Sequence, residues 1–196
     1  MQDGMRRMFQ EQEDVFYYIT AMNENYEHPA MPAGAEADIL KGLYAFRKGG
    51  DGSGPRVQLM GSGTIFREVI AAADLLKQDW GVDSDIWGAP SFNLLARDGQ
   101  DAERWNMLHP KEAPRLSHVA QKLAGAKGPV IAATDYIRMF AEQIRPFVPN
   151  HYVVLGTDGF GRSDTREKLR HFFEVDRYWV TLAALKTLAD EGTISR

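Results

Sequence analysis

Cysteine is absent from the 196 residues, which excludes disulfide bonds, thiolate zinc sites, iron–sulfur clusters and a cysteine nucleophile. The sequence also has no apolar run near the roughly 20 residues that cross a bilayer, and its start, MQDGMRRMFQEQED, lacks a signal peptide's apolar stretch. A formal net charge of -4 gives no basic footprint for nucleic acid. We therefore expect a cytoplasmic protein with no membrane and no nucleic-acid partner.

Signatures of metal and nucleophilic catalysis are missing as well. The five histidines form neither an HExxH motif nor an i, i+4 pair, so the sequence predicts no metal site. No serine lies in a GxSxG elbow, so a nucleophilic triad has no support. His109 precedes a proline at a predicted helix end, where its imidazole can interact with terminal carbonyl groups. The sequence alone assigns no catalytic residue.

What the sequence does contain is an alternation of apolar strands and amphipathic helices. At 22.0 kDa the chain has the length of about one domain, or of one domain with a fragment of another. The alternation predicts an α/β domain whose mostly parallel sheet is covered on both faces. The predicted strands are Val15–Thr20, Val57–Gly61, Asp83–Pro90, Pro129–Thr134 and His151–Thr157. The predicted helices are Ala35–Phe46, Ile65–Trp80, Asp101–Pro110, Leu116–Leu123, Asp135–Pro149, Thr165–Val175 and Tyr178–Gly192, with a helix or turn over SFNLLARDG.

Two glycine-rich segments resemble cofactor motifs only in part. Gly61-Ser62-Gly63-Thr64 links a strand to a helix, but Phe66 stands where a dinucleotide fingerprint needs its third glycine. We interpret it as a tight turn, with phosphate binding at the helix start as the alternative. Gly50-Asp51-Gly52 copies the opening of the thiamine diphosphate motif without the asparagine expected about thirty residues downstream, and its composition favours a surface loop.

The stretch LGTDGFGRSDTREKLRHFFEVD, residues 155–176, combines a strand end, a glycine turn and a charged helix. Asp164 and Glu167 fit a helix capping box, as Asp101 fits an N-cap earlier in the chain. Capping does not explain Asp158, Phe160 and Arg162, which follow a strand at the edge where ligands and functional loops gather in α/β folds. We interpret these three residues as a contact with another domain or subunit.

Three strings of the sequence resemble one family closely. RDGQDAERWNMLHP, ATDYIRMFAEQIRPFVP and LGTDGFGRSDTREKLRHFFEVD resemble the C-terminal part of the homodimeric pyruvate dehydrogenase decarboxylating component, and YYITAMNENYEHPAMPAGAEADILKGLY is similar to the segment leading into it. The GSGT turn with its helix and TDGFGRSD look more distantly like the C-terminal domain of transketolases. The resemblance covers essentially the whole chain.

The resemblance implies a fold and a domain division. It implies a three-layer α/β/α domain with a mixed sheet of about five strands, one of them antiparallel, either Val15–Thr20 or Val57–Gly61. Residues 1–20 would end a preceding pyrimidine-binding domain, residues 21–55 would form a connector with a helix, and residues 56–196 would form the transketolase C-terminal-like domain.

The resemblance also implies a function for the complete enzyme. That enzyme would use thiamine diphosphate and magnesium to decarboxylate pyruvate and acetylate the lipoyl group of a dihydrolipoyl acetyltransferase component, as a homodimer. The cofactor would lie between two other domains, so no catalytic, cofactor-binding or metal residue is carried onto this chain, which we expect to be inactive alone and to bind no cofactor. The alternative is a self-standing module that binds a nucleotide or other anion at the helix after Gly63 or near Arg162.

Overall fold

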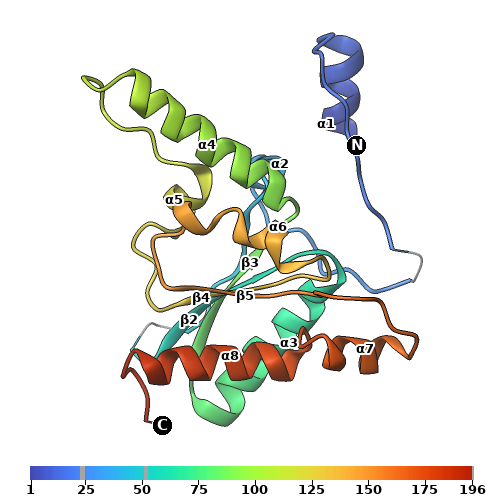
Figure 1. Cartoon of the computed structure of the whole chain (residues 1–196), viewed down its shortest axis with the longest axis vertical. Coiled ribbons are helices and arrows are strands. Elements are labelled where there is room, and N and C mark those ends of the chain that lie inside the picture. Colours follow the sequence, from blue (N-terminus) through green and yellow to red (C-terminus); the bar gives the residue numbers. More distant parts are fainter. Residues whose placement is uncertain (23–24, 51–52, 196) are drawn as a thin grey trace. The chain divides into compact units, whose positions relative to one another are not determined.

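The computed structural model describes residues 1–22, 25–50 and 53–195. Contacts within the chain divide it into two compact units, Met1–Ala30 and Met31–Arg196 (Figure 1). No helix in the described residues is long and apolar enough to span a membrane. The candidate site belongs to the second unit.

The first unit is a short helical segment held by ion pairs. The helix α1 (Gln2–Met5) continues into a π-helical turn, η1 (Arg6–Gln10). Arg7 binds Glu13 at 2.5 Å and donates to the Tyr17 hydroxyl at 2.8 Å. The predicted strand Val15–Thr20 is wrong for this chain, because those residues form no strand and Phe16 is 86% exposed. A strand needs a neighbouring strand to pair its backbone groups, and none is present in the described part of this unit.

The second unit is built on one five-stranded mixed sheet, as predicted. The strands β1 (Tyr44–Arg47), β2 (Arg56–Gly61), β3 (Asp83–Gly88), β4 (Val130–Ala133) and β5 (Tyr152–Leu155) lie in the order β1-β3-β2-β4-β5. β1 is antiparallel to β3, and the other pairs are parallel. The order reverses between β2 and β4, so their carboxyl ends form the switch point of the sheet.

The antiparallel strand corrects two predictions. It is β1, whereas Val57–Gly61 forms most of the central parallel strand β2, and Val15–Thr20 lies outside the sheet. The helix predicted over Ala35–Phe46 is only α2 (Glu36–Leu40), after which Gly42 takes a φ of +95° and the chain enters β1. A side chain at Gly42 would lie 2.8 Å from the Ser91 carbonyl oxygen, so the turn requires glycine. Residues Tyr44–Arg47 therefore form a strand paired with β3, although their local sequence favours a helix.

Helices cover both faces of the sheet (Figure 1). On one face α3 (Phe66–Trp80), preceded by the 3-10 turn η2 (Gly63–Ile65), packs with α8 (Arg177–Asp190) over Leu59, Ile86 and Ile131. The other face, with Met60, Val130 and Ala132, is covered by α4 (Phe92–Leu108), α5 (His118–Leu123) and α6 (Arg138–Glu142). These two apolar layers confirm the predicted three-layer architecture.

Helix boundaries correct several further predictions. α4 runs without a break through Gly99, and its N-cap is Ser91, whose side chain accepts from the Leu94 N–H at 3.2 Å; the predicted cap, Asp101, lies inside the helix. Glycine fits at position 99 because a Cβ there would lie 2.3 Å from the ring of Phe147.

The helices near the C-terminal edge of the sheet are also shorter than predicted. The segment predicted as one helix over Asp135–Pro149 is α6 followed by the 3-10 turn η3 (Arg145–Phe147), where Pro146 cannot continue an α-helix. The next helix, α7 (Arg166–Phe172), is capped by Thr165 and not by the predicted Asp164.

Candidate contact surface at the carboxyl ends of the strands

Two loops meet where β4 and β5 end. The backbone N–H of Thr157, after β5, donates to the carbonyl of Tyr136, after β4, at 2.9 Å, and the Thr157 hydroxyl donates to the Asp135 carbonyl at 2.5 Å. Gly156 allows this approach, since a Cβ there would lie 2.8 Å from the backbone nitrogen of Arg138 and 2.9 Å from the carbonyl oxygen of Tyr136. The carboxyl ends of the two strands are thereby fixed to each other.

Asp158 fixes the start of α6. One of its carboxylate oxygens accepts from the Arg138 guanidinium at 2.6 Å, and the other accepts from the Arg138 backbone N–H at 2.9 Å. These hydrogen bonds from the side chain and the backbone of Arg138 lower the pKa of the Asp158 carboxyl below its usual value. Asp158 therefore remains a carboxylate at neutral pH, with a partner inside the domain.

Phe160 and Arg162 lie on the loop between β5 and α7. Gly159 has a φ of +92°, and the next residue, Phe160, is 95% exposed. The guanidinium of Arg162 lies 4.9 Å from the ring centroid of Phe172, within the range of a cation–π contact. The structure thus brings Asp158 to Arg138 and Arg162 to Phe172, and it leaves Phe160 in solvent.

Apolar side chains surround this loop, which sequence reasoning missed. A hollow of about 190 Å³ is lined by Arg138, Leu155, Gly156, Asp158, Phe172, Phe173 and Glu174. We call the exposed apolar residues of these two loops and of α6 and α7 the edge surface: Tyr136, Ile137, Met139, Phe160 and Phe172, which are 43%, 46%, 66%, 95% and 54% exposed. The run DYIRM, directly after a buried strand, was the sequence feature that could have indicated these exposed apolar residues. Exposed apolar groups of this kind are typical of surfaces that contact another protein.

The GSGT turn has the geometry of a tight turn rather than of a phosphate cradle. A Cβ at Gly61 would lie 2.9 Å from Phe66 Cα, and Gly63 has a φ of +54°. The Asp135 carboxylate lies beside this turn, with Oδ1 3.1 Å from the Cβ position of Gly63 and Oδ2 3.5 Å from the Thr64 hydroxyl. A carboxylate at that place repels a phosphate, so the geometry does not support the anion-binding alternative.

The segment that resembles the opening of a thiamine motif lies at the other end of the strands. Its Asp51 and Gly52 are outside the described residues. Asp83 lies next to Gly50, and Asp85 accepts a hydrogen bond from the Gly49 backbone N–H at 3.0 Å. Both carboxylates pair with cations: Asp83 with Lys77 at 2.8 Å and Asp85 with Arg56 at 2.6 Å. These paired carboxylates do not fit a magnesium site. In the described residues no group of three or more His, Asp or Glu side chains could hold a metal ion.

Comparison with known proteins identifies relatives of the whole chain. It is 77% identical over 197 residues to the pyruvate dehydrogenase E1 component of Cupriavidus necator, and 58% identical over 195 residues to that of Pseudomonas aeruginosa. The E1 component of Escherichia coli is 56% identical over 198 residues. These matches cover 99–100% of this chain but only 22% of each relative. The resemblance drawn from the sequence is confirmed.

Solved structures share the fold at low sequence identity. A transketolase from Leishmania mexicana superposes with a TM-score of 0.55 at 18% identity, over 83% of this chain and 20% of that one. A transketolase from Pichia stipitis gives 0.52 at 16% identity, over 80% and 19%. Residues 1–29 match the pyruvate dehydrogenase E1 component middle domain. Because residues 42–176 match the transketolase-like TK C-terminal domain, the chain belongs to the family of that domain.

Proposed function

We propose that this chain is the C-terminal part of a pyruvate dehydrogenase decarboxylating component, in which it serves structure and assembly. The observation that carries the proposal is the 77% identity to the E1 component of Cupriavidus necator over the full chain. The complete enzyme would decarboxylate pyruvate and transfer the acetyl group to the lipoyl group of a dihydrolipoyl acetyltransferase component. We place this enzyme in the cytoplasm, as a homodimer.

Thiamine diphosphate and magnesium belong, in this proposal, to parts of the longer protein outside this chain. The structure supports this for one segment, because the carboxylates of Asp83 and Asp85, next to Gly50 and Gly49, are already paired with Lys77 and Arg56. We assign no catalytic, cofactor-binding or metal residue to this chain.

The proposed domain division keeps residues 1–20 as the end of a preceding domain and residues 56–196 as the body of the C-terminal domain. The match of residues 1–29 to the middle domain supports the assignment of residues 1–20 to a preceding domain. Residues 21–55 remain the proposed connector, and they also contribute β1, the edge strand of the sheet.

Asp158, Phe160 and Arg162 have a proposed role in contacting another domain or subunit. Phe160 supports it most directly, because burying a side chain that is 95% exposed removes a large apolar area from water. Asp158 contributes by fixing Arg138 and the start of α6, and Arg162 by packing on Phe172. In the complete enzyme, Arg162→Ala should weaken assembly more than it slows turnover. Loss of turnover with assembly intact would contradict this role.

The test of the proposed function is pyruvate-dependent reduction of an artificial electron acceptor, with thiamine diphosphate and magnesium added. The 196-residue chain should show no turnover, while a longer protein that includes the preceding domains should be active. Turnover by the 196-residue chain, or an inactive longer protein that is folded and cofactor-loaded, would overturn the proposal.

A further inference from the structure

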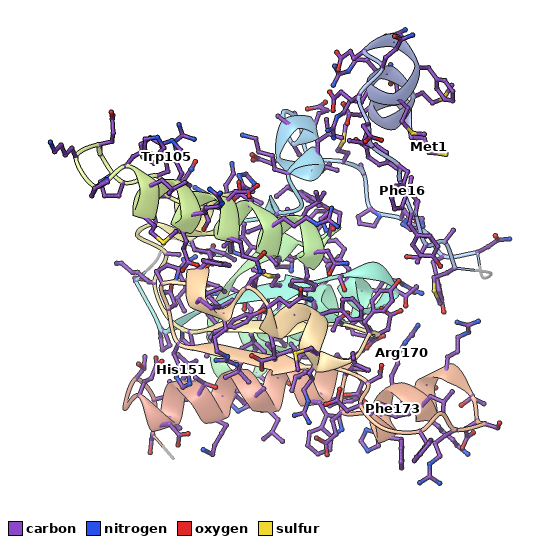
Figure 2. All side chains as sticks on the ribbon, turned by 45° about the horizontal axis from the view of Figure 1, so that its top comes forward. Met1, Phe16, Trp105, His151, Arg170 and Phe173 are labelled. Atoms are coloured by element: carbon purple, nitrogen blue, oxygen red, sulfur yellow. The ribbon has the colours of Figure 1, made fainter. Side chains whose placement is uncertain are left out.

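The hollow at the end of β5 has two aromatic walls and adjoins the edge surface, to which Phe172 also belongs. The rings of Phe172 and Phe173 meet edge to face, with centroids 5.0 Å apart and an interplanar angle of 87°. Figure 2 labels Phe173, which ends α7 before the chain enters α8. Leu155 and Phe173 are partly buried against the core, and Gly156 adds no side chain to the space. The hollow therefore has an apolar side that can pack against a chain of methylene groups.

The charged groups that line the hollow do not balance. They are Arg138, Asp158 and Glu174. Arg138 and Asp158 neutralise each other through two hydrogen bonds, whereas Glu174 forms no ion pair within the described residues. The pKa of the Arg138 guanidinium is raised chiefly by its hydrogen bond to Asp158 and, more weakly, by the charge of Glu174, so the Glu174 carboxylate lies near the same hollow. The lining carries one surplus negative charge.

Basic side chains near the hollow leave this charge uncompensated. The Arg162 guanidinium lies on the Phe172 ring, 4.9 Å from its centroid, and makes no ion pair with Glu174. Three basic side chains of α7 have acidic partners elsewhere: Arg170 with Glu68 at 3.6 Å, Lys168 with Asp164 at 3.9 Å, and His171 with Asp176 at 2.9 Å. One carboxylate thus remains available beside two aromatic rings.

Glu174 holds its carboxylate at a backbone position that favours glycine. Its φ is +59°, and its N–H donates to the His171 carbonyl at 3.1 Å where α7 ends. A left-handed residue at the end of a helix is usually Gly or Asn, because the Cβ of other residues crowds the backbone. Glycine would therefore end α7 with less strain. The end of the helix does not explain glutamate at this position, whereas a role for its carboxylate does.

The size and chemistry of the hollow fit one lysine side chain. Its volume of about 190 Å³ lies below the roughly 300–1,000 Å³ of a small-molecule site, and it can take one long side chain. The methylene stem of a lysine would pack on Leu155 and the two rings, and its ammonium group would lie between Glu174 and the ring faces. A guanidinium has five donors in a planar fork, so a single available carboxylate suits the compact ammonium better.

We infer that the hollow binds a lysine side chain from a segment of the longer protein that lies outside this chain, with Glu174 as the anionic partner. This chain spans 22% of the relative from Cupriavidus necator, so most of such a protein lies outside it. Apolar residues next to the lysine would pack on Phe160 and Ile137, which are 95% and 46% exposed. The inference rests on the proposed contact role of Asp158, Phe160 and Arg162, and it adds the chemistry of the segment: a lysine flanked by apolar side chains.

Saturation-transfer NMR on the 196-residue chain tests the lysine site with two matched probes. N-acetyl-lysine N-methylamide should bind with a Kd of roughly 1 mM, as expected for a single side chain. N-acetyl-norleucine N-methylamide has the same stem without the ammonium group, and it should bind about fivefold more weakly because it loses the ion pair and the cation–π contact. Equal binding of the two probes, or binding of neither, would overturn the inference.

Variants at position 174 separate binding from folding. Glu174→Gln should weaken binding of the lysine probe about fivefold without changing the backbone. Glu174→Gly should weaken it equally and raise the Tm, because glycine removes the left-handed strain, so a folding defect cannot account for the loss. The matched control is Glu167→Gln, an exposed carboxylate of α7 that does not line the hollow and should leave binding unchanged. Unchanged binding in Glu174→Gln, or an equal loss in Glu167→Gln, would contradict the site.

Two peptides and the longer protein test the source of the lysine. Acetyl-Leu-Lys-Leu amide should bind more tightly than the single lysine probe, and acetyl-Leu-Glu-Leu amide should not bind. Phe160→Ala should remove the gain from the flanking leucines. In the longer protein the hollow should already be filled, so equal binding of the lysine peptide there would show that the lysine does not come from the same protein. These measurements use neither pyruvate nor thiamine diphosphate, so their failure is distinct from failure of the proposed enzyme function.

Discussion

Replacing Glu68 with glutamine should remove the ion pair that connects α3 with α7 and α8. Glu68 is only 7% exposed on α3. Its carboxylate accepts from Arg177 of α8 three times, from Nε at 2.9 Å and from Nη2 and the backbone N–H at 3.2 Å each. The Arg170 guanidinium of α7 lies 3.6 Å from Glu68 Oε1. One buried carboxylate thus holds the last turn of α7 and the start of α8, both more than 100 residues away in sequence.

The expected loss is about 2 kcal/mol of unfolding free energy. Removing one partner of a fully buried pair costs about 3–5 kcal/mol, because the remaining charge is left without compensation. Here the Arg177 side chain is 42% exposed and can regain water, which places the cost nearer the roughly 1.5–3 kcal/mol of one charge-assisted hydrogen bond. For a domain of this size, 2 kcal/mol corresponds to a Tm about 4–8 °C lower.

The stabilisation should depend on pH in a known direction. Burial by itself would raise the pKa of Glu68, but the hydrogen bonds and charge of Arg177, with the charge of Arg170, lower it below its ordinary value of 4.5. A pKa that is lower in the folded state contributes stability that is complete above 4.5 and is lost as the pH falls through the folded value. The difference between the wild-type chain and Glu68→Gln should therefore be largest at neutral pH and should shrink below pH 4.5.

Urea unfolding followed by circular dichroism measures this difference at neutral and acidic pH. The matched control is Glu142→Gln, which also breaks a pair of hydrogen bonds to an arginine: Arg145 donates to Glu142 at 2.6 and 2.8 Å, but on an exposed surface. That variant should lose less than about 1 kcal/mol. Three results would contradict the proposed role of Glu68: a Glu68→Gln chain as stable as the wild type, an equal loss of stability in both variants, or a loss at Glu68 that does not change with pH.

Two further predictions concern local geometry. Gly156→Ala should destabilise the domain by about 1–3 kcal/mol, because its Cβ would lie 2.8 Å from Arg138 N and Cγ. The control is Gly161→Ala, since nothing lies within 4 Å of a Cβ at that position. Equal thermal unfolding temperatures of the two variants would contradict the close approach at Gly156. Ser91→Ala should cost about 1 kcal/mol by removing the N-cap of α4. Asp101→Ala, inside the same helix, should change stability by less than about 0.5 kcal/mol, and the reverse order in denaturant melts would show that the cap lies at Asp101.

The candidate surface could be predicted only in part from the sequence. The position of Asp158, Phe160 and Arg162 after a buried strand indicated a functional edge of the sheet. Their partners could not be foreseen, because Asp158 binds Arg138 across twenty positions of sequence, and that contact forms only once β4 and β5 lie side by side. The apolar character of the edge surface likewise depends on which side chains of α6 face solvent.

Local pattern determined most of the strands and helices. Apolar runs and turn residues within windows of about ten positions were enough to predict β2 to β5, α3, α5 and α8, and the absence of cysteine and of metal-ligand spacings excluded whole classes of site. Only the tertiary structure decided the rest: that Tyr44–Arg47 pairs with β3 as a strand, and that Val15–Thr20 finds no strand to pair with in the described part of its unit. The physical reason is that the periodicity of apolar side chains depends on neighbouring residues, whereas strand pairing and ion pairs depend on residues that meet only when the chain has folded.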